Sequence, residues 1–152
     1  PKHPDTVFVE VNHAATLHRA NRPKPVVQAQ IDRARPLALE ILGEKHPQTE
    51  SIDRIQAYSD LRAGRWSEAV VQFRALREKG QAERKPGEPP KAQVGWGLAT
   101  ALERSGQPEE AARIRASDVE WLYDLPDEEL SADDRNALEI IAEEAGYLGK
   151  QR

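Results

Sequence analysis

One row of side chains in this sequence could bind an acidic ligand. Arg54, Tyr58 and Arg62 recur at every fourth position, so on a helix they share one face. Two guanidinium groups beside a phenol suit a carboxylate, because arginine donates paired, charge-assisted hydrogen bonds to carboxylate oxygens. In the alternative interpretation the arginines pair with Asp53 or Asp60 on a solvated face, where such pairs contribute little stability. The row therefore predicts either a carboxylate-binding surface or an ordinary charged face.

Patterns for metal binding and catalysis are incomplete. Glu10 and His13 have the i, i+3 spacing of di-iron helical bundles, but the sequence supplies no second Glu-x-x-His. His13 and His18 lack the i, i+4 spacing of a helical zinc site, and the chain has no cysteine. Glycine-rich phosphate loops and a Gly-x-Ser-x-Gly nucleophile turn are also missing. We therefore expect no cofactor, no metal and no enzymatic activity.

Composition favours helices and argues against several kinds of partner. Charged residues make up 32% and aromatic residues only 5% of the 152 residues, which suits helices better than strands. The isoelectric point of about 5.6 argues against nucleic-acid binding. No apolar run has the length of a membrane span, and the first residues of the sequence lack the basic-then-apolar layout of a signal peptide. We expect a soluble, cytoplasmic protein, and because the sequence starts at Pro1 and lacks methionine, we expect it to be a piece of a longer one.

A short signature recurs along the chain and marks a repeat. His3-Pro4-Asp5-Thr6 and His46-Pro47-Gln48-Thr49 lie 43 residues apart, and Pro89-Pro90 stands at the next such interval. Each start is followed by an alanine and, seven places later, by a turn residue: Ala14 with Asn21, Ala57 with Gly64, and Ala99 with Gly106. A small side chain lets two helices approach closely, and Gly or Asn accepts the left-handed conformation that ends a helix. The spacing therefore predicts three helical hairpins.

The hydrophobic periodicity places the helices. We expect them near 4–20, 24–43, 47–63, 66–83, 89–105 and 108–123, and a seventh near 132–146 that begins after Ser131 and carries the apolar stripe Leu138, Ile141, Ala142 and Ala145. Residues 1–123 then hold three repeats, about 3–45, 46–88 and 89–123, and residues 124–152 form an acidic linker and a capping helix. A cap is expected because stacked repeats need a terminal element with a polar outer side.

The charge is distributed unevenly. Residues 1–117 carry 19 basic and 15 acidic side chains, whereas residues 118–148 carry 1 basic and 11 acidic side chains. Opposite charges attract over long range. The acidic segment from Asp124 to Glu129 could therefore lie in a basic groove of this chain or of a second copy, which would make it autoinhibitory or dimerising.

The repeat resembles a known family. The segment 12–21 is similar to the first helix of a tetratricopeptide repeat of the kinesin light chain type, and the segment 42–49 is similar to the junction between such repeats. The likeness covers about residues 3–115 and is strongest in the second repeat, at Ala57, Gly64, Trp66, Glu68 and Ala69. It implies an all-α, right-handed superhelix of three hairpins plus a C-terminal capping helix, with a concave groove that binds a peptide or a partner protein.

The resemblance also implies which residues line that groove: Asn12 and Arg19 in the first repeat, Arg54, Tyr58 and Arg62 in the second, and Trp96 and Thr100 in the third. Asn12 matches an asparagine whose amide can hold a peptide backbone by donor and acceptor together; the alternative is a merely exposed polar residue. Trp96 could anchor a partner, since tryptophan is enriched in binding hot spots, or could pack internally, as we expect of Trp66 and Trp121.

These observations favour a non-enzymatic protein–protein interaction module, the repeat domain of a larger bacterial regulator, whose partner is a protein or an acidic peptide. The alternative is a structural domain that self-associates, for instance as a homodimer, through the open ends of its repeats and sets the geometry of its parent protein.

Overall fold

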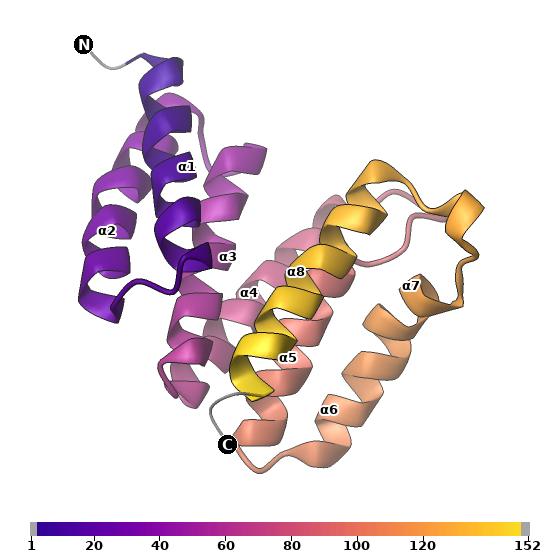
Figure 1. The fold of residues 1–152 in the computed structure, drawn as a ribbon. Coiled ribbons are helices and arrows are strands. Elements are labelled where there is room, and N and C mark those ends of the chain that lie inside the picture. Colours follow the sequence, from indigo (N-terminus) through magenta and orange to yellow (C-terminus); the bar gives the residue numbers. More distant parts are fainter. Residues whose placement is uncertain (1–2, 150–152) are drawn as a thin grey trace. The chain divides into compact units, whose positions relative to one another are not determined.

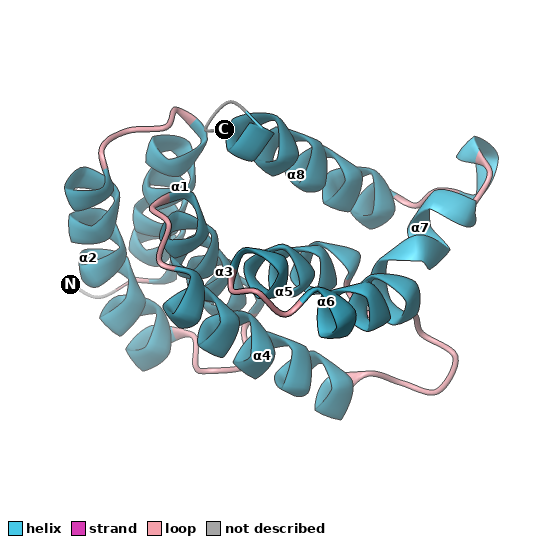
Figure 2. Ribbon diagram, turned by 90° about the horizontal axis from the view of Figure 1, so that it is seen from below, coloured by secondary structure: helices cyan, strands magenta, loops and turns pink. Residues whose placement is uncertain are grey.

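The computed structural model describes residues 3–149, whose regular secondary structure is entirely helical, with loops between the helices and no strand among the described residues (Figure 2). The predicted all-α class is confirmed. The main helices are α1 (Pro4–Arg19), α2 (Lys24–Ile41), α3 (Pro47–Arg62), α4 (Trp66–Glu83), α5 (Ala92–Arg104), α6 (Pro108–Ile114), α7 (Glu120–Asp124) and α8 (Ala132–Gly149). A π-helical segment, η1 (Arg115–Val119), joins α6 to α7, and a 3-10 turn, η2 (Asp127–Glu129), precedes α8.

The His-Pro signature is a helix-capping device. The ring nitrogen Nδ1 of His3 accepts a hydrogen bond from the backbone N–H of Asp5 at 3.1 Å, and Nδ1 of His46 accepts one from Gln48 at 3.1 Å. In each case proline occupies the first turn, where its missing N–H costs nothing. The two histidines therefore begin α1 and α3 in the same way.

The turn residues and small residues of the predicted hairpins behave as expected. Asn21, Gly64 and Gly106 all have positive φ, at 53°, 78° and 81°, the left-handed conformation that closes a helix. The small residues that pair with them along the chain are fully buried, each at 0% exposure: Ala14, Ala57 and Ala99. The landmarks read from the sequence thus correspond to real helix ends and close helix approaches.

The chain divides into two compact units, residues 1–63 and 64–152, with the boundary between α3 and α4. In the first unit α1, α2 and α3 pack against one another in all three pairings (Figure 1). Their shared core consists of aliphatic side chains from each helix: Val7, Val11, Ala14, Val27, Ile31, Ala34, Ala38, Ile52 and Ile55. This core fixes which faces of the three helices remain outside.

In the second unit α5 is the central helix. It contacts α4, α6, η1 and α8, and most of its residues are buried, as expected for a helix that is covered on several sides. Leu98 and Leu102 are 1% and 0% exposed, so the leucines of this helix belong to the core of the unit. Across the described residues, no helix combines the length and the apolar character needed to cross a bilayer.

Three details differ from the sequence-based expectations. The fifth helix begins at Ala92 and not at 89, because Pro89 and Pro90 stay outside it. The sixth is interrupted by η1. In α8 the residues Ala142 and Ala145 are exposed, so their predicted place in the apolar stripe was wrong; the buried residues are Ala137, Ile141, Glu144 and Leu148. Their spacing of four, three and four positions keeps them on one face of the helix.

Candidate partner-binding site

Helix α1 presents two of the predicted groove residues to solvent. Its buried residues are Val7, Val11, Ala14 and His18, whereas Asn12 and Arg19 are exposed. The carbonyl of Asn12 accepts a hydrogen bond from the hydroxyl of Thr16 at 2.9 Å. The asparagine amide and the arginine guanidinium thus stand on an ordered helix whose opposite face is fixed in the core.

Arg62 holds the C-terminal end of α1. Its guanidinium donates a hydrogen bond from α3 to the carbonyl of His18 in the last turn of α1, at 2.5 Å. Carbonyls at a helix C-terminus lack partners within the helix and favour a nearby cation. Arg62 therefore positions the turn of α1 that carries Arg19, a structural role that the sequence did not suggest.

The other two members of the arginine and tyrosine row lie deeper than expected. Arg54 is half-buried, and burial lowers the pKa of its guanidinium from the ordinary value, an effect that the nearby Tyr58 and Glu50 oppose. Tyr58 is only 2% exposed. The row does share one helix, but its tyrosine presents almost no surface to a ligand. A role of Arg54, Tyr58 and Arg62 in partner binding stays a prediction.

Two acidic residues near this row each form an ion pair with a residue of α2. The carboxylate of Asp53 forms an ion pair with the guanidinium of Arg35 on α2 at 3.0 Å. The carboxylate of Asp60 forms one with the ammonium group of Lys24 on α2 at 2.9 Å. Both contacts join α2 to α3 and do not lie along α3 itself. The acids therefore fasten two helices together.

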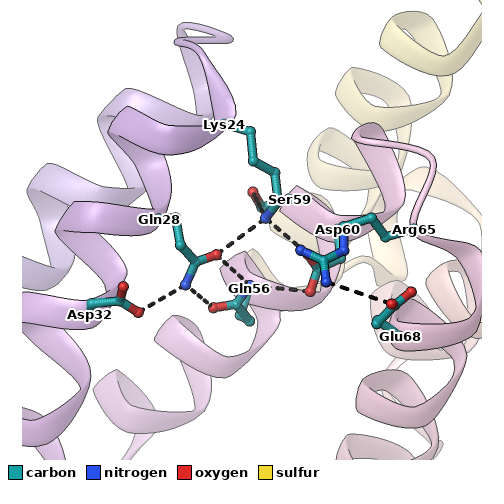
Figure 3. Close-up of polar contacts among 8 residues, drawn as sticks. All are labelled: Lys24, Gln28, Asp32, Gln56, Ser59, Asp60, Arg65 and Glu68. Carbon is teal, nitrogen blue, oxygen red and sulfur yellow. Dashed lines mark hydrogen bonds and ion pairs between the residues drawn. The ribbon is translucent and has the colours of Figure 1, made fainter.

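A polar network between α2 and α3 escaped the sequence-based reasoning (Figure 3). Lys24 donates to Ser59 at 3.1 Å and pairs with Asp60, while Gln28 and Gln56 exchange two amide hydrogen bonds at 2.7 and 2.8 Å. The signal was available in the sequence, because Lys24, Gln28 and Asp32 repeat at every fourth position on one face. We call this set the α2–α3 polar seam: Lys24, Gln28, Asp32, Gln56, Ser59 and Asp60.

Glu10 has a structural role as well. Its carboxylate accepts from the amide of Gln30 at 2.6 Å and pairs with Arg33 at 3.1 Å, both on α2. The described residues include no group of three or more His, Cys, Asp or Glu side chains placed to hold a metal ion. Glu10 therefore ties α1 to α2.

The groove residues predicted in the third repeat are largely enclosed within the second unit. Thr100 is 6% exposed, and its hydroxyl donates to the carbonyl of Trp96 at 2.8 Å. Trp96 is half-buried and packs, with Trp121, against an apolar cluster of Ala92, Leu122, Ala137 and Ile141. The packing role expected of Trp121 is confirmed, and Trp96 shares it. Its role as an anchor for a partner stays a prediction.

Two arginines of α4 connect this helix to the segment that follows α5. Arg74 binds Glu110 through two hydrogen bonds at 2.6 and 2.9 Å, and Arg77 binds Asp118 at 2.6 and 3.2 Å. Hydrogen bonding from Arg74 lowers the pKa of the Glu110 carboxyl below its ordinary value. Asp118 lies on η1, where the π-helical turn directs a buried carboxylate toward α4. It also lines a cavity of about 220 Å³ beside the loop of residues 84–91.

Hydrogen bonding and charge pairing are thus the chemistry that the exposed part of the site supports. The Asn12 amide can donate and accept at once, as an extended peptide backbone requires, and Arg19 can bind a carboxylate. Comparison with family models, curated proteins and solved structures finds no match for this chain. The likeness to tetratricopeptide repeats therefore rests on the residues named above.

Proposed function

We propose that this chain is a non-enzymatic protein–protein interaction module, the repeat domain of a larger bacterial regulator, which binds a partner protein or an acidic peptide. In this proposal its helical hairpins belong to a right-handed, tetratricopeptide-type superhelix with a concave groove. The observation that carries it is a repeated local pattern: three left-handed turn residues, each seven places after a fully buried alanine. Repeats of this kind build extended surfaces for partners.

The exposed residues of α1 are the part of the groove that we expect to contact the partner first. Asn12 supplies the bond to the peptide backbone, and Arg19 supplies the preference for an acidic ligand. Arg62 acts indirectly in this scheme, because its hydrogen bond to His18 fixes the end of α1. Substituting Arg62 would disturb the fold and the binding together, so it is a poor residue for a first test.

The test is therefore a comparison of two charge-reversed variants. The doubly substituted Asn12→Ala, Arg19→Glu protein is used with a matched control, Arg113→Glu, which changes an exposed arginine on α6. Each is immobilised, exposed to an extract of its native cells, and the recovered proteins are quantified by mass spectrometry. We expect at least one protein that the wild type and the control recover and that the double variant loses.

The recovered protein is then purified, and its affinity is measured by calorimetry with the same three variants. A loss of at least ten-fold in the double variant alone supports the proposal. Equal affinities in all three variants would place binding away from α1 and remove its central claim. Circular dichroism of each variant establishes that the helices are intact.

The structural alternative, self-association, has one observation in its favour. The first unit exposes three large apolar side chains on α1 and α2: Val9 at 66%, Val26 at 40% and Leu39 at 42%. Single exposed apolar residues are common on protein surfaces, so the point needs a measurement. Sedimentation velocity over a hundred-fold range of protein concentration shows whether the chain self-associates. A dimer that the Val9→Lys substitution converts to monomer favours self-association. A protein that stays monomeric over the whole concentration range removes this alternative.

A further inference from the structure

Helix α8 covers an apolar surface that belongs to α5 and α7. Ala92 on α5 and Leu122 on α7 are each 1% exposed, and they pack against Ala137 and Ile141 of α8, which are 5% and 3% exposed. Partly buried side chains surround this cluster: Trp96, Trp121, Leu130 and Leu138. Without α8, two tryptophans and two aliphatic side chains would face solvent together. We call the residues Ala92, Trp96, Trp121 and Leu122 the α5–α7 face.

The composition of the α5–α7 face is that of a binding surface for a helix. Tryptophan is the residue type most enriched among binding hot spots, and an amphipathic helix that lays its apolar side on such a surface is a common recognition mode. The buried residues of α8 have the spacing of such a helix, at positions i, i+4, i+7 and i+11; Ala137, Ile141 and Leu148 are apolar, and Glu144 is a buried carboxylate. Helix α8 is thus seated on the α5–α7 face as a bound helical peptide would be.

The start of α8 is stabilised by its own residues. The hydroxyl of Ser131 accepts a hydrogen bond from the N–H of Asp134 at 3.1 Å, and the carboxylate of Asp134 accepts one from the N–H of Ser131 at 2.9 Å. This reciprocal cap forms within four residues. The segment before it, residues 126–129, is exposed and contains only the short turn η2. Helix α8 is therefore a self-capped helix at the end of an exposed tether.

We propose that α8 is a tethered occupant of a helix-binding site on the α5–α7 face, which an amphipathic helix of a partner protein occupies when α8 leaves. This inference rests on the proposed function and adds a second site and its regulation. The expected partner helix carries small and aliphatic residues at the spacing of Ala137, Ile141 and Leu148, and acidic residues on its outer side, as α8 does at Glu139 and Glu143.

The tether sets how strongly α8 competes. A short flexible linker gives an attached segment an effective concentration on the order of millimolar. A free helix with the same affinity, added at micromolar concentration, therefore cannot displace α8 from the intact protein. It can bind once the contact of α8 itself is weakened. This difference allows the site to be probed without knowing the partner.

The probe is a fluorescein-labelled peptide of residues 130–149, added to the 152-residue chain and followed by fluorescence anisotropy. The release variant is Ile141→Asp, which places a carboxylate in the apolar cluster. The matched control is Ala142→Asp, the same charge on the neighbouring exposed position. We expect the release variant to bind the peptide at least ten-fold more tightly than the wild type does, and the control to behave as the wild type.

Circular dichroism and hydrogen exchange report whether Ile141→Asp frees α8 alone. If it unfolds more of the unit, the milder Leu138→Gln replaces it as the release variant. Absence of peptide binding in the folded release variant, or equal binding by all variants, overturns the inference. Adding Asn12→Ala and Arg19→Glu to the release variant should leave peptide binding unchanged. Failure of the proposed function, in which the partner binds α1, can therefore be distinguished from failure of this inference, in which the peptide binds the α5–α7 face.

Discussion

Two helix contacts, one in each compact unit, are built by different physical means. Helices α2 and α3 meet through the α2–α3 polar seam, in which Lys24, Ser59 and Asp60 form a charged end and Gln28 and Gln56 form an amide pair. Helices α4 and α5 are held by close steric packing. A Cβ atom at Gly97 on α5 would overlap the ring of Phe73 on α4, which is 0% exposed.

The difference shows what the repeat determines and what it leaves open. Spacing along the chain determines where each helix begins, where it turns and which alanine is buried. It does not determine whether the next contact is polar or steric. Hydrogen bonds fix the register of two helices through direction, whereas a glycine against an aromatic ring fixes it through close approach. Substitutions that affect one contact and spare the other can test this distinction.

The largest effect is expected in the polar contact, from Lys24→Met. The substitution keeps the length of the side chain and removes the cation that lies 2.9 Å from Asp60, a carboxylate with a side-chain exposure of 4%. Removing one partner of a buried ion pair costs about 3 kcal/mol, because the remaining charge stays out of water. Urea denaturation measures the loss. Lys45→Met, at an exposed position in the loop before α3, should change stability by less than about 0.5 kcal/mol.

A smaller loss is expected in the steric contact, from Gly97→Ala. The added methyl group must displace the ring of Phe73 within a filled core, and overpacking of this kind costs about 2 kcal/mol. Gly80→Ala is the matched control on α4, since a Cβ atom there meets nothing within 4 Å. It should stabilise the protein by about 0.5 kcal/mol, because alanine favours a helix over glycine. Equal effects at the two glycines would show that α4 and α5 are not held by close packing.

Much of the fold could be predicted from the sequence, because the signals that place helices are local. The His-Pro starts, the left-handed turns at Asn21, Gly64 and Gly106, and the apolar periodicity each depend on a few neighbouring residues. The π-helical segment at 115–119 was not predictable in this way. Its residue Asp118 binds Arg77, which lies 41 positions away along the chain, and no local pattern records such a contact.

The candidate site was less predictable, because the same residue type serves binding and structure alike. Asn12 and Arg19 are exposed, as both a binding role and an ordinary surface position require, so their binding role stays a prediction. Arg62 and Trp96 have the residue types expected of a binding site, yet one fixes the end of α1 and the other packs beneath α8. Which arginine reaches a carbonyl, and which tryptophan is covered, depends on the neighbouring helices. Spacing on a single helix cannot provide that information.

The smallest effect is expected where a contact between helices is partly open to solvent, at Arg74 and Glu110. Hydrogen bonding from Arg74 keeps the pKa of Glu110 in the folded protein below its ordinary value of 4.5. A lowered carboxyl pKa adds stability above the unfolded-state value, and that stability is lost as the pH falls through the folded-state pKa. Surface pairs contribute about 0.5 kcal/mol. Glu110→Gln should therefore cost about this much between pH 5 and 7 and progressively less below pH 4.5. Thermal unfolding of both proteins at several pH values measures the difference, and a cost that stays constant down to pH 3 would mean that the Glu110 charge does not contribute to the contact between α4 and α6.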